Sequence, residues 1–237
     1  MTALLWKPST YIYPPRPEHS IPYEEINQFA NDQHLAQLKY NDTRIVIKVA
    51  DYYDERQNTH GKIEIWNRHK KKLNYVPTES TTAAILKLAS IISPNGWCLL
   101  DGGLLHSKHK AIKDTIVIWD ILVQNSEYLL GTTYQERYNT ILTDDVKLHY
   151  FQVGGYKICL GWCYGAAGEI LIPHLIPHAI WEIAWANIVE LNSNYDQPLI
   201  EGFVIKEMAG KLEMGLKPSN NGGWQTRCRV KTKSYRF

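Results

Sequence analysis

Short apolar runs rich in β-branched residues recur along the whole chain, and they constrain its fold more than any other feature. The clearest is residues 116–122 (IVIWDIL), whose length and composition predict a buried strand. Further strands are predicted at 45–49, 63–66, 97–100, 199–206 and 227–233, with shorter ones within 153–172. Apolar spacing and capping chemistry predict helices at 22–36, 79–92, 133–143 and 177–191. Because strands and helices mix without strict βαβ alternation, we expect an α+β fold with largely antiparallel sheets.

The size and composition of the chain fit one folded domain. Its 237 residues can bury a full core, and 44% apolar with 21% charged residues excludes disordered, collagenous and coiled-coil classes. It has no apolar run near the roughly 18 residues of a membrane span, and early prolines leave no signal-peptide core. Four scattered cysteines fit a reducing compartment. We therefore expect a monomer in the cytoplasm with no membrane partner, in which residues 1–21 form a proline-rich arm.

Charged residues near the edges of several predicted strands are candidates for one shared cleft. Lys39 precedes the strand at 45–49, and a lysine is a nucleophile only as the neutral amine, which requires desolvation or nearby cations. Residues 66–72 (WNRHKKK) place a dense basic patch beside a tryptophan, which suits phosphate contact. The cations of 229–233 (RVKTK) alternate at the strand period, so Lys231 and Lys233 project to one face. The net charge is only +2, so affinity for a polyanion has to come from such local clusters.

Six of these segments occur in an order that carries a resemblance. KYNDTR, WNRHKKKL, DGGLL, VIWDIL, EGFVIK and RVKTK resemble the motif series of the covalent nucleotidyltransferases, and specifically of the ATP-dependent polynucleotide ligases. Each element alone is weak, but together they cover residues 39 to 233 in order and in strand context. The resemblance implies a nucleotidyltransferase (ATP-grasp-like) fold of two antiparallel β-sheets flanked by helices, with an ATP cleft between the sheets. It implies a DNA ligase that seals 5′-phosphate/3′-hydroxyl nicks through a lysyl-AMP intermediate.

The resemblance also implies a role for each matching residue. Lys39 is the nucleophile that attacks the α-phosphate of ATP, and Lys231 with Lys233 neutralises that phosphate in the transition state. Nucleotide contacts are implied for Gln37, Arg44, Trp119 as the ring that stacks on adenine, and Glu201. Nucleic-acid contacts are implied for Arg68, Lys70 and Arg137, and Mg²⁺ contacts for Glu201. Phosphoryl transfer depends mainly on positioning and charge neutralisation, so a nucleophile, a metal ion and several cations are the parts that this chemistry needs.

The sequence departs from the ligase pattern at two places. Gly103 stands where these ligases usually carry a glutamate, and we expect Asp101, two residues earlier on the same strand face, to replace it as a metal ligand. The chain also stops at Phe237, shortly after Lys233, so we expect a single adenylation domain over 1–237 with no C-terminal oligonucleotide-binding domain. Either the domain works alone or a second domain has been lost. If it works alone, the basic patches at 68–72 and 227–236 and the proline-rich arm have to hold the nucleic acid.

Several alternatives remain open at this point. The DGGLL segment and the helix carrying Arg137 are more similar to DNA ligases, so nicked duplex DNA is the favoured substrate, in replication or repair. An RNA ligase of the same fold comes next, and GTP-dependent RNA capping is more distant. The compact chain suggests a phage or another small-genome source, and hence a bacterial or phage-infected cytoplasm. A non-catalytic nucleic-acid-binding protein that kept the fold is the alternative from another class.

A second pattern suggests a metal site of a different kind. Cys159, Cys163, His174 and His178 lie close to zinc-ligand spacing. However, the spacing departs from the strict finger pattern, and prolines precede both histidines. Buried thiols and capping histidines are therefore the favoured interpretation, and a zinc-bound interaction module is the less favoured one.

Overall fold

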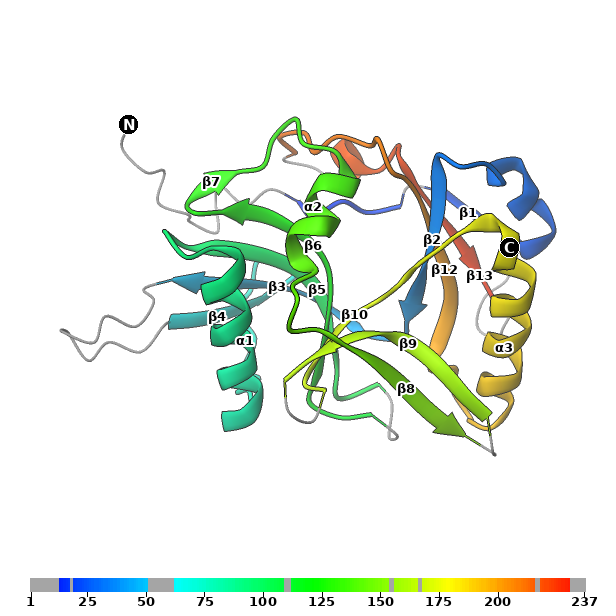
Figure 1. The fold of residues 1–237 in the computed structure, drawn as a ribbon, viewed down its shortest axis with the longest axis horizontal. Helices are drawn as coiled ribbons and strands as arrows, with labels where there is room; N and C mark the ends of the chain where they lie inside the picture. The colour runs from blue at the N-terminus through cyan, green and yellow to red at the C-terminus, as the bar shows by residue number, and fades with distance from the viewer. Residues whose placement is uncertain are drawn as a thin grey trace.

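The computed structural model describes residues 13–17, 19–50, 62–108, 112–153, 156–165, 168–215 and 218–230. Within these residues the strands form two sheets, with helices against them, and this confirms the α+β class (Figure 1). No helix in the described ranges is both long and apolar enough to cross a membrane.

The larger sheet has eight strands in the described chain and follows the order β4-β3-β5-β6-β10-β9-β8, with β7 paired to β6. Its pairs are antiparallel except for β10 beside β6. The strands run over β3 (Thr43–Ala50), β4 (Lys62–Asn67), β5 (Cys98–Leu105), β6 (Thr115–Gln124), β7 (Glu127–Tyr128), β8 (Lys147–Val153), β9 (Tyr156–Tyr164) and β10 (Ile170–Ile172).

The smaller sheet has five strands in the described chain, in the order β1-β13-β12-β2-β11. They are β1 (His19–Ile21), β2 (His34–Tyr40), β11 (Leu175–Ile176), β12 (Ile200–Glu207) and β13 (Gln225–Arg229). Only β1 and β13 pair in parallel here, so the expectation of largely antiparallel sheets is confirmed. The chain passes from the smaller to the larger sheet through Asn41 and Asp42, between β2 and β3. This places the end of β2 beside the start of β3, where the two sheets meet.

The helices cover the outer faces of the sheets. α1 (Glu79–Ile92) has the predicted bounds, and the Thr78 side chain caps it by accepting from the backbone N–H of Thr81. α2 (Tyr134–Ile141) begins at the predicted capping box of Thr133 and Glu136. α3 (Trp181–Ser193) follows the short 3₁₀ segment η3 (His178–Ile180), and a further 3₁₀ turn, η4, spans Pro218–Asn221. In Figure 1, α1 and α3 lie at opposite ends of the molecule, one against each sheet.

The helix predicted at 22–36 is wrong in its second half. Only a 3₁₀ helix, η2 (Tyr23–Phe29), forms there, and β2 begins at His34. The Asn31 side chain accepts a hydrogen bond from the backbone N–H of Gln33 at 3.0 Å, an Asx turn that redirects the chain. The following residues pair with β12 and β11, so sheet formation overrides the local helical spacing.

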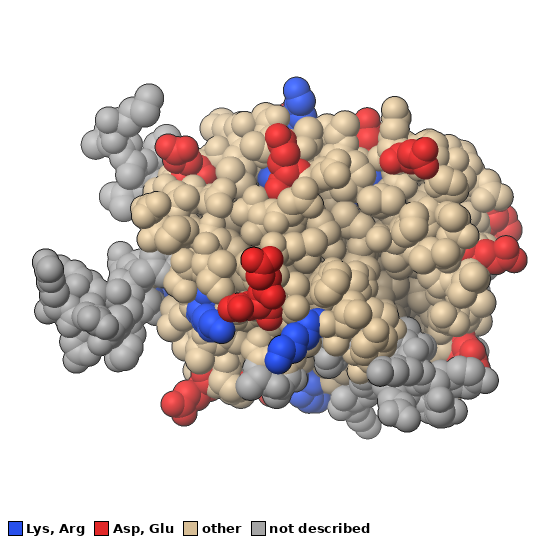
Figure 2. Space-filling view, in the orientation of Figure 1, with Lys and Arg blue, Asp and Glu red and all other residues tan. Residues whose placement is uncertain are grey.

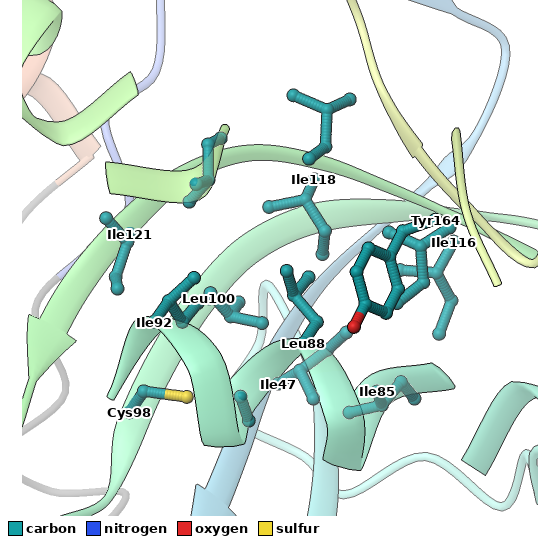
Figure 3. Close-up of a cluster of buried hydrophobic side chains, with 14 of the residues drawn as sticks. Ile47, Ile85, Leu88, Ile92, Cys98, Leu100, Ile116, Ile118, Ile121 and Tyr164 are labelled. Atoms are coloured by element: carbon teal, nitrogen blue, oxygen red, sulfur yellow. The ribbon is translucent and has the colours of Figure 1, made fainter. Parts of the chain in front are cut away.

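Two of the three apolar clusters found among the described residues hold the layers together. Figure 3 shows the core under α1, where Ile85, Leu88 and Ile92 pack toward side chains of the larger sheet such as Ile47 and Leu100. Fully burying each such side chain contributes about 1.5–3 kcal/mol. The second core joins the two sheets to each other, because Leu38 and Phe203 of the smaller sheet share it with Leu105 and Val117 of the larger one. This shared core fixes the relative position of the sheets.

Candidate active site

A cavity of about 710 Å³ lies between the two sheets, as the prediction of a cleft between them required. The smaller sheet lines it with Gln37, Lys39, Glu201, Lys206, Arg227 and Arg229, and the larger sheet with Arg44, Asn67, Asp101, Trp119 and Asp120. Figure 2, by contrast, shows a face on which acidic and basic side chains are scattered among mostly uncharged surface. The cleft therefore gathers cations from both sheets, although the net charge of the whole chain is small.

Lys39 and Glu201 form an ion pair in this cleft, in which the Lys39 ammonium donates to Glu201 Oε2. β2 and β12 are antiparallel neighbours, and their register shifts between Ile200 and Gly202. Glu201 is thus the extra residue of a β-bulge, a feature that re-aims side chains. Gly202 has a φ of +132°, and a Cβ there would lie 2.1 Å from the carbonyl oxygen of Cys228. Only glycine fits this position, so the local sequence Glu-Gly holds the bulge.

Several groups around Lys39 act on the pKa of its amine. Burial lowers the pKa of Lys39, the Glu201 carboxylate opposes this effect, and the Arg229 guanidinium adds to it. Arg229 Nη2 also lies 3.5 Å from Glu201 Oε2, so Lys39 and Arg229 share the same carboxylate oxygen. The Lys39 side chain is 20% exposed, enough for it to be reached from the cleft. The site thus holds a desolvated amine next to a group that can accept its proton.

Arg44 is bound on the floor of the cleft by Asp101. Arg44 Nε donates to Asp101 Oδ1 at 2.7 Å, and Nη2 donates to Oδ2 and to the carbonyl oxygen of Pro15. The Asp101 side chain is 2% exposed, and burial raises its pKa to about 7 even though Arg44 opposes the shift. Both oxygens of Asp101 thus accept from Arg44, and its expected role as a metal ligand stays a prediction. The resemblance gave no sign of this pairing.

Trp119 lies half-buried beside this pair. Its ring packs against the core shared by the two sheets, and the guanidinium carbon of Arg44 lies 4.6 Å from the ring centroid. A base that stacks on this face of Trp119 has to share the ring with Arg44 or displace it. Gln37 lies nearby in the cleft wall, almost fully buried, and its side-chain amide donates to the carbonyl oxygen of Pro173 at 3.3 Å.

Arg137 does not face the cleft, and its expected contact with nucleic acid is wrong. It is 1% exposed, and it donates to both oxygens of Asp120, at 2.8 Å from Nε and 3.1 Å from Nη2. Its third nitrogen donates to the carbonyl oxygen of Thr132 at 2.6 Å. A residue that is buried and paired in this way cannot reach a phosphate on the surface. Arg137 instead ties α2 to β6.

Lys206 is a buried cation that the sequence analysis did not single out. It is 4% exposed, and its ammonium nitrogen lies 3.9 Å from the centroid of the Tyr134 ring. Burial lowers its pKa to about 7, against the attraction of Asp120 and Asp101. Lys206 lies in the EGFVIK segment of β12, five residues after Glu201, and regular strand alternation would place the two on opposite faces. The bulge at Glu201 changes this alternation, so both residues line the cleft, and the motif alone did not indicate it.

The remaining predicted residues differ in their placement. Arg68 is exposed and lines the cleft, whereas Lys70 lies in the turn after β4 with a φ of +61° and its Nζ 5.2 Å from the Tyr13 ring. Lys231 and Lys233 lie outside the described residues. Arg229, two positions before Lys231, is the last cation of this motif that the structure brings to the cleft.

The suggested zinc ligands are only partly brought together. His174 Nε2 lies 3.2 Å from Cys159 Sγ, and the His174 ring meets Trp162 edge-on. Burial lowers the pKa of His174 and raises that of Cys159. Among the residues that the structure describes, no three His, Cys, Asp or Glu side chains are grouped so that they could hold a metal ion.

Comparison with known proteins found no matching family model and no matching curated protein. Solved structures are loosely similar. A mycobacterial DNA ligase D complexed with ATP and MES shares 15% identity at a TM-score of 0.48, over 91% of this chain and 60% of that one. The ligase domain of M. tuberculosis LigD shares 15% at 0.47, over 92% and 57%. The Chlorella virus DNA ligase-adenylate shares 14% at 0.42, over 91% and 67%. The chain thus spans about 60% of the first of these proteins.

Proposed function

We propose that this protein is an ATP-dependent polynucleotide ligase whose nucleophile is Lys39. The observation that carries the proposal is the half-buried Lys39 amine, paired with Glu201 in a cleft that cations line from two sheets. A lysine that only stabilises a fold needs neither a lowered pKa nor access to a cavity of nucleotide size. The motif order in the sequence supports the same assignment.

The first step transfers AMP to the protein. The Lys39 ammonium gives a proton to Glu201, the carboxylate to which it already donates a hydrogen bond. The neutral Nζ then attacks the α-phosphorus of ATP, forming a P–N bond while the bond to the bridging oxygen breaks and pyrophosphate leaves. The second proton that Nζ loses goes to the leaving pyrophosphate or to water. Arg229 and Lys206 lie close enough to the cleft to offset the negative charge of the transferring phosphate, and Lys231 with Lys233 is proposed to add to this.

Two further steps complete the proposed reaction. A 5′-phosphate oxygen of the nicked strand attacks the phosphorus of lysyl-AMP, the P–N bond breaks, and the Lys39 nitrogen leaves with a proton. The 3′-hydroxyl then attacks the activated 5′-phosphorus, AMP leaves, and the hydroxyl proton goes to a base or to water. Arg68, which lines the cleft, and Lys70, two residues later in the same turn, are proposed to bind the nucleic-acid backbone.

The two expected metal ligands, Glu201 and Asp101, differ in how well they suit a divalent metal ion. Glu201 lines the cleft next to Lys39, and a single carboxylate with phosphate oxygens is a usual Mg²⁺ environment. Asp101 fits less well, because both of its oxygens accept from Arg44. When bound, Mg²⁺ would screen the charge of the phosphate oxygens. Glu201 would hold it in the steps in which its carboxylate is ionised.

The proposed substrate is nicked duplex DNA, with nicked RNA as the alternative. The helix that carries Arg137 no longer favours DNA, since that arginine is buried. The DGGLL motif remains as support. An assay that compares the sealing of nicked DNA with that of nicked RNA therefore decides between the two substrates.

The proposal is tested by intact mass of the purified protein before and after incubation with ATP and Mg²⁺. We expect the wild type to gain one AMP, Lys39→Ala to gain none, and the control Lys87→Ala, an exposed lysine on α1, to gain AMP normally. Sealing of nicked DNA and of nicked RNA by the same three proteins then identifies the substrate. An adduct that persists in Lys39→Ala contradicts the assignment of the nucleophile. A wild type without any adduct, either from expression or after ATP, favours a nucleic-acid-binding protein without ligase activity.

A further inference from the structure

Asp42 is a carboxylate of the cleft to which the sequence analysis gave no role. It lies in the two-residue turn between β2 and β3, three positions after Lys39, and it lines the cavity. The turn is held on both sides. Asn41 donates to the carbonyl oxygens of Leu199 and Pro198, at 3.0 and 3.1 Å, and the Lys108 ammonium donates to the carbonyl oxygen of Asp42. The side chain of Asp42 is therefore presented from a fixed backbone.

The Asp42 carboxylate fills the space that a side chain at position 103 would use. A Cβ built on Gly103 would lie 2.5 Å from Asp42 Cγ and 2.6 Å from Asp42 Oδ2. Gly103 is the residue that stands where the ligases resembled here carry a glutamate. The Asp42 carboxylate, from the neighbouring turn, thus occupies the space in which a side chain at position 103 would lie. A residue larger than glycine at position 103 would require Asp42 to move.

One oxygen of this carboxylate lacks a partner in the described chain. Asp42 Oδ2 is buried and accepts no hydrogen bond from any described residue. Lys39, Arg44 and Lys108 attract its negative charge, although burial raises the pKa of Asp42 to about 7. A buried acceptor without a donor is costly, so an oxygen of this kind beside a cavity is a place for a ligand's donor.

The position of Asp42 within the cleft indicates which donor it meets. Under the proposed function, Lys39 marks the α-phosphate and Trp119 marks the base. Arg44, which lies over Trp119, is the cross-strand partner of Gly103, the residue that Asp42 covers. Asp42 therefore lies between the phosphate end and the base end of the site. In a nucleotide, the group between base and α-phosphate is the ribose, whose hydroxyls are hydrogen-bond donors.

We propose that Asp42 accepts a hydrogen bond from a ribose hydroxyl of the bound nucleotide, and that this carboxylate takes the place of the side chain that Gly103 lacks. The inference rests on the proposed function. It makes Asp42 a specificity-determining residue that distinguishes ribonucleotides from deoxyribonucleotides, and it separates this role from that of Asp101, whose oxygens both accept from Arg44.

The test measures nucleotide binding without the covalent step, by calorimetry on the full chain carrying Lys39→Ala. ATP, 2′-deoxy-ATP and 3′-deoxy-ATP are compared, with and without Asp42→Ala. We expect the protein with Asp42 to bind ATP roughly 10- to 100-fold more tightly than the analogue lacking the recognised hydroxyl. Asp42→Ala should weaken ATP binding by the same factor and leave that analogue unchanged. The control, Asp144→Ala, removes an exposed carboxylate and should preserve the discrimination.

A second pair of variants tests the exchange of positions. Gly103→Glu alone should lose nucleotide binding, because its side chain meets Asp42, whereas Asp42→Gly combined with Gly103→Glu should regain the preference for ATP. If Asp42→Ala is too unstable to measure, Asp42→Asn keeps the volume and should show a reduced preference. Thermal unfolding of each variant shows which ones are folded.

The outcomes separate this inference from the proposed function. If the wild type forms the AMP adduct but Asp42→Ala weakens all three nucleotides equally, Asp42 acts on the phosphates or a metal, and the ribose assignment is overturned while the ligase proposal stands. The ribose assignment is also overturned if the effect of Asp42→Ala on ATP binding disappears when Mg²⁺ is omitted. If no nucleotide binds and no adduct forms, both proposals fail together.

Discussion

Replacing Arg137 with alanine would leave the Asp120 carboxylate buried without its countercharge. In the native structure Arg137 donates three hydrogen bonds, two to Asp120 and one to the carbonyl oxygen of Thr132. Its guanidinium carbon also lies 5.4 Å from the centroid of the Trp224 ring. The Asp120 side chain is 2% exposed, so water cannot replace the lost donors without opening the core. The perturbation therefore acts on the folded state of the protein and not on its surface.

The expected cost follows from this geometry. Removing one partner of a buried, hydrogen-bonded ion pair destabilises a protein by about 3–5 kcal/mol. For a chain of this length each kcal/mol corresponds to about 2–4 °C in the midpoint of thermal unfolding, so Arg137→Ala should lower the midpoint by roughly 6 to 20 °C. Replacing both partners, with Arg137→Met and Asp120→Leu, should cost less than the single change because no unpaired charge stays buried.

Thermal unfolding followed by circular dichroism measures this effect, and binding of nicked DNA to the folded variant measures whether Arg137 has a second role. Arg68→Ala is the matched control, because it removes an exposed arginine and should change the unfolding free energy by no more than about 0.5 kcal/mol. An Arg137→Ala protein that unfolds at the same temperature as the wild type would refute the argument from burial. A folded Arg137→Ala protein that binds nicked DNA as weakly as Arg68→Ala would refute the conclusion that Arg137 makes no contact with nucleic acid.

Three other perturbations have defined outcomes. Arg68→Ala should weaken binding to nicked DNA of any sequence and lower the slope of log affinity against log salt by about one, whereas an unchanged slope excludes a phosphate contact. Burial lowers the pKa of Lys206 to about 7. At pH values above 7 the native protein has therefore lost this proton, whereas the unfolded chain still binds it. The unfolding free energy should thus rise above pH 7, by up to about 1.4 kcal/mol per pH unit, relative to Lys206→Met in urea titrations, and parallel pH profiles would contradict this. Gly102→Ala should cost about 1–3 kcal/mol in the same titrations, since its Cβ would lie 2.2 Å from the carbonyl oxygen of Val117, while Gly223→Ala, which faces open space, should be neutral.

The sequence predicted the elements whose signals are local. The run at 116–122 lies within β6, and the capping box at Thr133 opens α2, because periodicity and capping depend on neighbours along the chain. The helix expected at 22–36 failed because pairing with strands far along the chain decided the conformation of 34–36. Local spacing contains no information about those partners.

The same limit explains what was predicted of the site. Lys39, Glu201, Arg44 and Trp119 were singled out by their motifs, and the structure does bring them to one cleft. What each of them contacts was not predictable, because an ion pair between strands depends on register and on which side chain is buried. The sequence therefore did not indicate that Arg137 is buried. It also did not indicate that Asp42 occupies the space beside Gly103, because the two residues lie on segments far apart in the chain.

Two cations of the cleft, Lys39 and Arg44, are paired with carboxylates of the cleft, and under the proposed function an entering nucleotide has to compete with these pairs. Arg44 is bound by Asp101 and covers Trp119, and Lys39 is bound by Glu201. Under the proposed function, a base that stacks on Trp119 moves Arg44 off the ring, and attack by Lys39 requires that it give up a proton. Cations that leave a carboxylate in order to meet a phosphate add little to ground-state affinity, because one favourable contact replaces another. They accelerate transfer to the extent that the new contact is stronger in the transition state, where the phosphate oxygens have taken on more charge. Pairing of the cleft charges with one another is therefore compatible with the proposed catalysis, and under that proposal it favours weak binding of ATP followed by efficient transfer of AMP.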